Sequence, residues 1–441
     1  MSTQFVNSVA VTEPSLPEVH SSVSISKSPV SWRRLLGFLG PGFLISVGYM
    51  DPGNWATDIA GGSQFGYTLL SVIMISNLMA ILLQSLSLKL GVATERDLAQ
   101  ICRESYGRWV SFGLWIGAEI AIAACDLAEV IGSAIALNLL FHIPLFYGVL
   151  ITGLDVLLIL LLQRWGFRYV EALVMALIGT IIAMFGVQLF LSKPEYWPAL
   201  KNLLIPSSAI LRNPDMLYIA IGMLGATVMP HNLYLHSSIV QSRNYKRTPK
   251  GKREAIFMAN VDSALALTVA LFVNAAIVVV AAAVFYRSGH FEVAAIQDAY
   301  KLLSPLVGVA GASTIFAIAL LASGQNSSIT GTLAGQVVME GFIHLKVSPW
   351  LRRMITRTLA IIPTIIVVAI TGERGTEKLL LLSQVILSLQ LSFAVVPLVI
   401  FTGSRKKMGE FVNGPWLQGL SWLTAALIAG LNAWFLVLML R

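Results

Sequence analysis

Apolar runs long enough to cross a bilayer recur along almost the whole chain. Eleven can be marked in the 441 residues, near 38–64, 67–90, 110–138, 145–163, 169–191, 215–241, 258–286, 306–339, 352–371, 377–402 and 417–440. A span needs about 20 apolar residues and must satisfy its backbone hydrogen bonds internally, so each run is expected to be a transmembrane helix. Only 12% of the residues are charged, whereas a soluble domain has about 25%. The pattern predicts an all-α, multi-pass membrane protein.

Basic residues are divided unevenly between the loops. With the N-terminus inside, 22 of the 30 Lys and Arg residues fall on the inner side and 8 on the outer side. Such an excess marks the cytoplasmic side. We therefore expect a cytoplasmic N-terminus, with residues 1–34 as a disordered tail, and an extracytoplasmic C-terminus. Because the positive residues lie in membrane loops, the net charge of +8 does not indicate a nucleic-acid partner, and no obligatory protein partner is evident.

The first span contains Asp51-Pro52-Gly53-Asn54 at the expected bilayer depth. Proline has no N–H group and glycine does not favour a helix, so the helix is expected to break here. The carbonyl of Gly48 then loses its usual donor. Broken backbone at membrane depth is tolerated only where it is buried in protein or lines a cavity. Free carbonyls beside Asp51 and Asn54 therefore predict a cation site.

A second break is expected in the sixth span, at Met229-Pro230. Pro230 cannot donate to the carbonyl of Ala226, which leaves that oxygen free. The Met229 sulfur would favour a softer transition metal over Mg²⁺ or Ca²⁺, which prefer oxygen ligands. Met229 could instead be core packing. Gln384, in the tenth span, could add an oxygen when the site closes, or could join helices by a hydrogen bond.

The two breaks open two groups of five spans. An offset of five inverts the second group in the membrane, as in transporters that bind substrate between two discontinuous helices. This pattern predicts a ten-helix transport core over 35–402, with repeats at 35–191 and 215–402. An eleventh transmembrane helix follows at 417–441.

Carboxylates in the third span indicate a proton route. No Lys or Arg occurs from Trp109 to Gln163, yet Glu119, Asp126 and Glu129 lie on similar faces of one helix. Intramembrane carboxylates are costly and face a bundle interior or water. They could relay protons or make helix-packing hydrogen bonds.

Basic groups could complete this route. His231 follows the second break and could take up a proton near neutral pH. His236 could act in the same way or make a structural hydrogen bond. Arg353 could pair with the carboxylates, or it could be a cytoplasmic anchor like Arg352.

The paired motifs resemble the Nramp family, and within it the bacterial manganese transporters. The resemblance covers about residues 35–440 and includes Asp126-Leu127-Ala128-Glu129 and Ser383-Gln384-Val385. It implies a LeuT-like fold and proton-coupled import of divalent metals. It also implies that Asp51, Asn54, the Ala226 carbonyl and Met229 bind metal, with Gln384 joining in some states. Asp126, Glu129, His231 and Arg353 match the family's proposed proton route.

The predicted function is proton-coupled import of Mn²⁺, and also of Fe²⁺ and other first-row metals, across the cell membrane. The protein would have no permanently bound cofactor, and its partners would be the metal ion, protons and the lipid bilayer. One alternative is a sodium-coupled carrier of organic solutes with the same fold, which would not need Met229. A metalloenzyme would need clustered ligands such as His-Glu-x-x-His, and the six histidines do not supply one.

Overall fold

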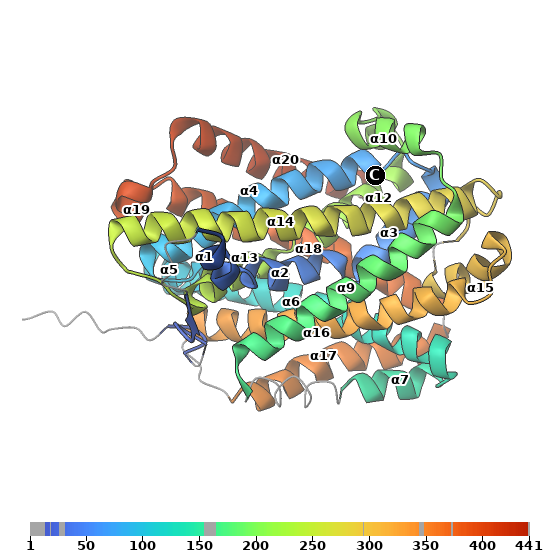
Figure 1. Ribbon diagram of the computed structural model, residues 1–441, viewed down its shortest axis with the longest axis horizontal. Helices are drawn as coiled ribbons and strands as arrows, with labels where there is room; N and C mark the ends of the chain where they lie inside the picture. The colour runs from blue at the N-terminus through green and yellow to red at the C-terminus, as the bar shows by residue number, and fades with distance from the viewer. Residues whose placement is uncertain are drawn as a thin grey trace, which may run out of the picture.

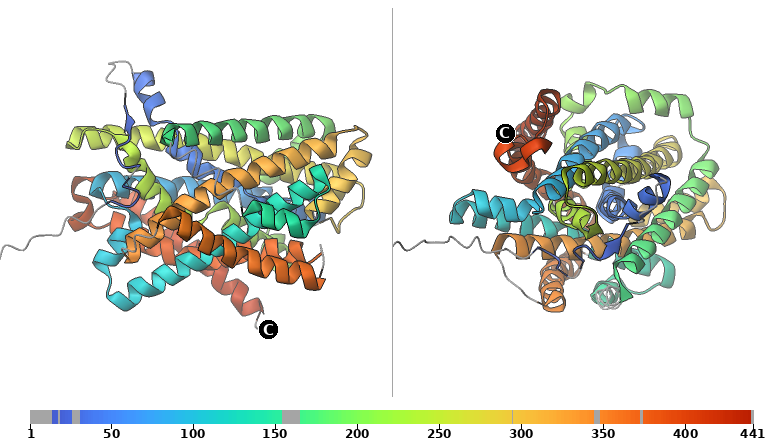
Figure 2. Two further views of the ribbon diagram at one scale, coloured as in Figure 1. Left: turned by 90° about the horizontal axis from the view of Figure 1, so that it is seen from below. Right: turned by 60° about the vertical axis from the view of Figure 1, so that its left-hand side comes forward.

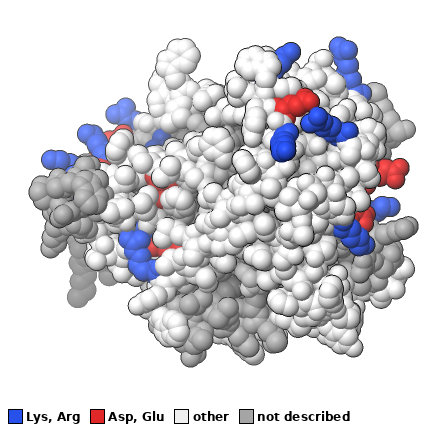
Figure 3. Space-filling model, turned by 45° about the vertical axis from the view of Figure 1, so that its right-hand side comes forward, with Lys and Arg blue, Asp and Glu red and all other residues white. Residues whose placement is uncertain are grey.

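The structure is a computed structural model that describes residues 14–17, 19–25, 31–153, 165–293, 295–343, 348–371 and 374–439. Long helices run along one axis of the molecule and pack into a bundle (Figures 1 and 2). Seven of the described helices are long and apolar enough to cross a membrane. On the face shown in Figure 3, charged side chains lie toward the two ends of the molecule and leave a largely uncharged belt between them.

Described helices occur within each of the eleven expected spans, in the expected order. The spans hold α2 (Pro41–Ser46) with α3 (Pro52–Phe65), α4 (Leu70–Thr94), α6 (Arg108–Phe141), α7 (Leu145–Thr152), α9 (Phe167–Ser192), α12 (Pro214–Thr227) with α13 (Pro230–Ile239), α14 (Pro249–Ala281), α16 (Ala312–Ile343), α17 (Pro349–Thr371), α18 (Arg374–Thr402) and α20 (Pro415–Met439). Residues 154–163 of the fourth expected span lie outside the described residues.

Short elements connect these helices. They are α1 (Ser31–Phe38), α5 (Leu98–Ser105), α10 (Tyr196–Leu204), α11 (Ala209–Arg212), α15 (Ile296–Val307), α19 (Arg405–Met408), the 3₁₀ turns η1 (Val47–Met50), η2 (Val240–Ser242) and η4 (Gly409–Phe411), and the π-helical turn η3 (Ala282–Tyr286). The strands β1 (Val23–Ser24) and β2 (Arg243–Asn244) pair in parallel. The helix α1 and the C-terminal end of α20 lie toward opposite ends of the bundle, as an odd number of spans requires (Figure 1).

Both expected helix breaks are present. The first span is divided into α2, η1 and α3, with Asp51 extended at φ −71° and ψ 166°. The sixth span is divided into α12 and α13, which are separated by Val228 and by Met229 at φ −75° and ψ 125°. A proline opens the second helix of each pair, because its fixed φ suits the first helical position and its missing N–H costs nothing there. The boundaries of the two repeats stay a prediction.

The helix α3 lies inside the bundle, where α6, α12, α14 and α18 pack around it. Its Trp55 ring is held between Phe185 of α9 and Phe316 of α16, with centroid distances of 4.8 Å and 5.2 Å. Trp55 is fully buried. These edge-on aromatic contacts fix α3 just beyond the first break.

The expectation that residues 1–34 form a disordered tail is wrong for the described part of that segment. Leu16, Val19 and Val23 are buried, and β1 pairs with β2, which follows the sixth span. Ser31–Phe38 form the helix α1. The polar composition of the segment suggested disorder, but these three apolar side chains pack against elements that are distant in the sequence.

Candidate metal site

The first break presents two buried oxygens that lack a partner. Asp51 caps α3, because its Oδ1 accepts a 2.8 Å hydrogen bond from the backbone N–H of Asn54. The other oxygen of Asp51 and the side-chain oxygen of Asn54 have no hydrogen-bond partner among the described residues, although both side chains are at most 1% exposed. Buried polar atoms are normally paired. Unpaired oxygens at a helix break therefore indicate a place for a bound cation.

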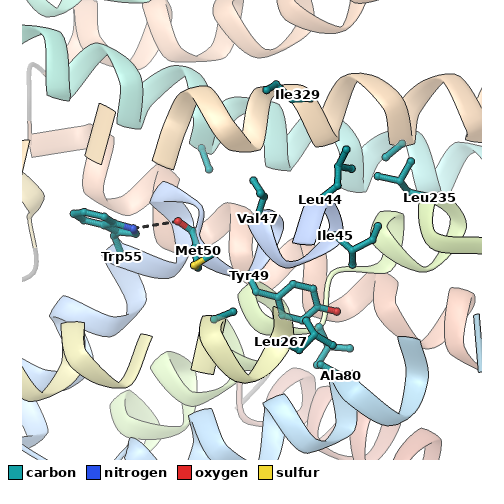
Figure 4. Close-up of a cluster of buried hydrophobic side chains, with 14 of the residues drawn as sticks. Leu44, Ile45, Val47, Tyr49, Met50, Trp55, Ala80, Leu235, Leu267 and Ile329 are labelled. Atoms are coloured by element: carbon teal, nitrogen blue, oxygen red, sulfur yellow. Dashed lines mark hydrogen bonds between the residues drawn. The ribbon is translucent and has the colours of Figure 1, made fainter. Parts of the chain in front are cut away.

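Hydrogen bonds from three helices hold the backbone of this break in place. The Trp55 ring nitrogen donates to the Met50 carbonyl over 3.2 Å, as the dashed line in Figure 4 shows. The Ser323 hydroxyl of α16 donates to the same carbonyl over 2.5 Å. Asn274 of α14 donates its side-chain amide to the Tyr49 carbonyl over 2.7 Å. These bonds satisfy carbonyls that the interrupted helix leaves without a backbone donor.

The two breaks face each other. Met229 is fully buried and packs with Cys125 of α6 and Leu387 of α18. If Gly48 of η1 carried a Cβ atom, that atom would lie 3.2 Å from the Met229 sulfur. Ala226 is also buried, and its carbonyl has no helical donor because the residue four positions later is Pro230. The expected ligands therefore come from elements that touch.

Gln384 of α18 lies next to both helix breaks. A Cβ atom on Gly53 would overlap the Gln384 amide, and one on Gly225 would overlap the Gln384 carbonyl. The side-chain oxygen of Gln384 has no partner among the described residues, while its nitrogen donates to Ser383 over 2.9 Å. Gln384 thus lies against both broken helices and offers a third unpaired oxygen.

The third-span carboxylates face α16, as a route through the bundle requires. Asp126 and Glu129 are at most 1% exposed. A Cβ atom on Gly331 would lie 2.9 Å from Glu129 Oε1 and 3.1 Å from Asp126 Oδ1. The Ser327 hydroxyl and the Cys125 thiol both donate to Glu129 Oε1, over 2.9 Å and 3.6 Å. Since Cys125 also packs on Met229, one residue connects Glu129 with the metal site.

The other expected proton-route residues lie in different surroundings. His231 is buried and has no hydrogen-bond partner among the described residues. Glu119 is only partly buried and accepts a 3.1 Å bond from Trp115. Arg353 lies on α17, and its side chain is outside the part of the chain that the structure describes.

His236 makes the structural hydrogen bond that was the alternative to a relay role. Its Nδ1 is 2.9 Å from Gln84 Oε1, and the Gln84 amide donates to the Tyr49 hydroxyl over 2.8 Å. Tyr49 belongs to η1, so this chain of bonds joins α13, α4 and the first break. Relay of a proton by His236 stays a prediction.

The comparisons with known proteins identify the family. Residues 42–438 match the family model described as natural resistance-associated macrophage protein-like. The chain belongs to the Nramp family. It is 62% identical over 424 residues to the divalent metal cation transporter MntH of Nostoc sp. (strain PCC 7120), an alignment that covers 96% of each protein. As a member of a transporter family, this Nramp chain is not an enzyme.

Solved structures confirm the predicted fold class. The crystal structure of the Eremococcus coleocola manganese transporter, in complex with an aromatic bis-isothiourea substituted compound, is similar at a TM-score of 0.88 and 45% identity. The match covers 95% of this chain and 90% of that one. Mhp1, a nucleobase-cation-symport-1 family transporter, matches at a TM-score of 0.61 and 15% identity over 90% of this chain and 91% of its own. The Nramp chain therefore has the expected LeuT-like fold.

Sequence reasoning missed a buried ionic cluster at the start of α2. Arg243 donates to Glu171 over 2.8 Å, and Asp262 accepts from the backbone N–H groups of Gly40 and Gly42 over 3.2 Å and 2.6 Å. All three charged side chains are at most 1% exposed. Glu171 and Asp262 fall within expected spans, and intramembrane carboxylates are a functional signal in their own right. The cluster fixes the end of α2 that lies away from the break.

A second carboxylate on α3 was also missed. Asp58 lies on α3, seven residues after Asp51, which caps the same helix. Asp58 is 2% exposed, and its Oδ2 has no hydrogen-bond partner among the described residues. The same rule for intramembrane carboxylates could have found it. The half-helix beyond the break therefore carries a carboxylate besides the one in the site.

Replacing Gly225 with alanine is expected to lower metal uptake several-fold. The new Cβ would overlap the Gln384 carbonyl oxygen and lie 2.7 Å from the Ser388 backbone nitrogen, so α12 and α18 must separate. Overpacking of this kind costs about 1–3 kcal/mol. Gly186→Ala in α9 is the control, because no atom lies within 4 Å of its Cβ position. Uptake by the two variants in proteoliposomes checks this, and equal rates would contradict the close contact.

Proposed function

We propose that this chain imports divalent first-row transition metals, Mn²⁺ and also Fe²⁺, across the cell membrane together with protons. The observation that carries the proposal is a set of three buried side-chain oxygens, from Asp51, Asn54 and Gln384, that have no hydrogen-bond partner among the described residues. They lie where the two helix breaks face each other, beside the buried Met229 thioether. The names of its relatives support the substrate class, since they include a divalent metal cation transporter and a manganese transporter. The metal is transported cargo, with no permanently bound cofactor.

In this proposal, Asp51, Asn54, the Ala226 carbonyl and Met229 bind the ion, and Gln384 joins them as the site closes. The carboxylate supplies charge that offsets the lost hydration of a divalent cation. The oxygens alone would suit Mg²⁺ or Ca²⁺ as well. The sulfur shifts the preference toward softer first-row ions, which bind thioether ligands more readily.

Protons would use a separate route through α6. Asp126 and Glu129 are buried beside α16, and Cys125 contacts both Glu129 and Met229. Binding of a dication at Asp51 would favour release of a nearby proton, since like charges repel across a site of low dielectric constant. We propose that this proton passes by Asp126 and Glu129, with His231 and Arg353 assisting, to the cytoplasm. Glu119 and His236 would have supporting roles.

Alternating access requires the site to open to one side at a time. All five proposed ligands are at most 1% exposed, which corresponds to a state closed on both sides. Gln384 and α18 cover the site on the side of α3, while the ionic cluster of Arg243, Glu171 and Asp262 holds α2. We propose that α2 and α13 move when the site opens toward the N-terminal side, which the loop charges indicate to be the cytoplasm.

Uptake into proteoliposomes tests the function directly. We expect Mn²⁺ to enter faster when the outside is more acidic than the inside, and Fe²⁺ to compete far better than Mg²⁺ or Ca²⁺. Replacing Na⁺ with choline should leave the rate of Mn²⁺ uptake unchanged. Uptake that required Na⁺, or that transported an organic solute in place of Mn²⁺, would support the alternative of a sodium-coupled solute carrier and contradict the proposal.

Replacing Glu129 with glutamine is expected to uncouple protons from metal. The variant keeps the size and the hydrogen-bonding oxygen of the side chain, which Ser327 and Cys125 contact, but cannot ionise. Metal affinity should remain near that of the wild type, while stimulation by a pH gradient should fall by about a hundredfold or more, the usual range for removal of a proton-transfer group. An internal pH dye measures this, with Glu195→Gln, an exposed site, as control. Unchanged proton entry would exclude Glu129 from the route.

A further inference from the structure

The described part of the N-terminal segment, residues 14–17 and 19–25, crosses the end of the bundle where α5, α13 and α16 meet. We refer to these residues as the N-terminal strap. Its buried side chains Leu16, Val19 and Val23 are 2%, 7% and 5% exposed. Figure 1 shows this dark blue segment beside α1, at the same end of the bundle as α5 and α19. The strap is therefore packed against the membrane domain at its N-terminal face.

One end of the strap binds α5 and α16. The Ser15 hydroxyl donates to Asp97 Oδ2 over 2.7 Å, and the Leu16 backbone N–H donates to Glu340 Oε2 over 3.0 Å. Asp97 caps α5, and its Oδ1 accepts from the backbone N–H of Gln100 over 2.8 Å. Ser15 and Asp97 are both buried, so their bond is shielded from water. This end is thus fixed to α5 and to the continuous helix α16.

The other end binds the segment that follows α13. The Ser21 backbone N–H donates to the Gln241 carbonyl over 2.9 Å, and Val23 and Ser24 pair with Arg243 and Asn244 in the two-stranded sheet. The Ser238 hydroxyl of α13 also donates to the Ser15 carbonyl, over 3.4 Å. The strap therefore connects the end of α13 with α5 and α16.

The strap connects helices that have to move relative to each other when the site opens. Opening of the site toward the N-terminal face would displace α13, the half-helix on that side of the second break, relative to the continuous helix α16. The chain from the strap continues through α1 into α2, the matching half-helix of the first break. Both half-helices that border the exit would therefore be tied to the strap or continuous with it.

We propose that the N-terminal strap is a latch that keeps the N-terminal face of the transporter closed and must detach before the site opens there. The latch acts on alternating access and so rests on the proposed function. Strap contacts form only while α13 and α16 are close, so they stabilise the closed face and slow release of the ion on that side. The strap thereby sets the balance between the two directions of opening.

A native cysteine can report the opening. Cys125 is 1% exposed and packs on Met229, so a water-soluble reagent reaches it only when the site is open. Cys102, the other cysteine, is buried in α5 and is replaced in the background Cys102→Ser. The rate at which a membrane-impermeant maleimide labels Cys125 in vesicles, applied to one face at a time, then measures exposure of the site to that face.

Ser15→Asp is the variant that releases the strap. The substitution removes the hydroxyl that donates to Asp97 and places a second, larger acidic group against this buried carboxyl, and two acidic groups side by side in a buried site are unfavourable. We expect labelling of Cys125 from the N-terminal face to become about tenfold faster, and labelling from the opposite face to slow. Ser24→Asp makes the same chemical change on the exposed side of β1, and should label at the parent rate.

Two results would overturn the latch. The first is that Cys125 in Ser15→Asp is labelled at the same rate as in the parent protein. The second is that labelling becomes equally faster from both faces, which would indicate that the whole protein is less tightly packed. If Ser15→Asp fails to fold, Ser15→Ala removes only the hydrogen bond to Asp97 and should still accelerate labelling about threefold from the N-terminal face. The labelling experiment contains no metal, and the proposed function is tested separately by Mn²⁺ uptake in proteoliposomes. A negative labelling result can therefore be told apart from a failure of the proposed function.

Discussion

Replacing Asp51 with alanine is expected to abolish measurable Mn²⁺ binding. The substitution removes the only carboxylate among the proposed ligands, and its unpaired Oδ2 is fully buried. Loss of one partner from a buried charge pair costs roughly 3–5 kcal/mol, or at least about a hundredfold in affinity. Isothermal titration calorimetry of the purified protein in detergent measures the change.

The expected loss of Mn²⁺ binding in Asp51→Ala does not come from a loss of folding stability. Asp51→Ala removes the helix cap on Asn54, which costs about 1 kcal/mol, but it also removes a buried carboxylate. The melting temperature should therefore change little. Asp51→Asn keeps the cap and a neutral oxygen, and should bind weakly. Asp215→Ala, an exposed acid at the start of α12, should bind Mn²⁺ like the wild type. Wild-type affinity in Asp51→Ala would exclude the proposed site.

Replacing Met229 is expected to change which metals compete rather than to stop transport. Without the sulfur, the remaining ligands are oxygens, and these do not disfavour Ca²⁺ or Mg²⁺. We expect Met229→Ala to retain part of its Mn²⁺ uptake, and its preference for Mn²⁺ over Ca²⁺ to fall on the order of tenfold, or about 1.4 kcal/mol. Competition flux assays in proteoliposomes measure the ratio.

Substitutions of methionine by leucine, which has a similar volume, distinguish a role of the Met229 sulfur from a role in packing. Met229 is buried against Cys125 and Leu387, so alanine leaves a cavity there. Met229→Leu keeps the volume but has no sulfur, and should lose the same discrimination at a cost below about 1.5 kcal/mol in stability. Met223→Leu makes the same exchange at another buried methionine, which lies on α12, and should leave selectivity unchanged. Unchanged selectivity in both Met229 variants would argue that the thioether is core packing.

The helix breaks could be predicted because their cause is local. Pro52 and Pro230 remove backbone donors wherever the rest of the chain lies, and the structure places both at the start of a new helix. The eleven spans were predictable for the same reason, since bilayer thickness acts on each run separately. That the two breaks face each other was inferred from repeat symmetry. The structure supports this inference, because a Cβ atom on Gly48 would lie 3.2 Å from the Met229 sulfur.

Contacts between distant segments could not be predicted in this way. His236 bonds Gln84, which is 152 residues away, and that pairing requires the folded bundle. The cluster of Arg243 and Glu171 forms because α9 and the segment after α13 meet. Polar composition suggested a disordered tail, but Leu16 is buried by surfaces that only the folded bundle creates. Pairing of Arg353 with the carboxylates stays a prediction, as its side chain is not among those described.

Anomalous diffraction at the manganese edge, from crystals grown with Mn²⁺, tests most directly whether the two helix breaks share one ion. We expect a single strong peak between η1 and the start of α13, within bonding distance of both the Asp51 carboxylate and the Met229 sulfur. A peak elsewhere in the bundle, or one that touches Asp51 while the sulfur points away, would contradict a shared site of hard oxygens and one soft sulfur.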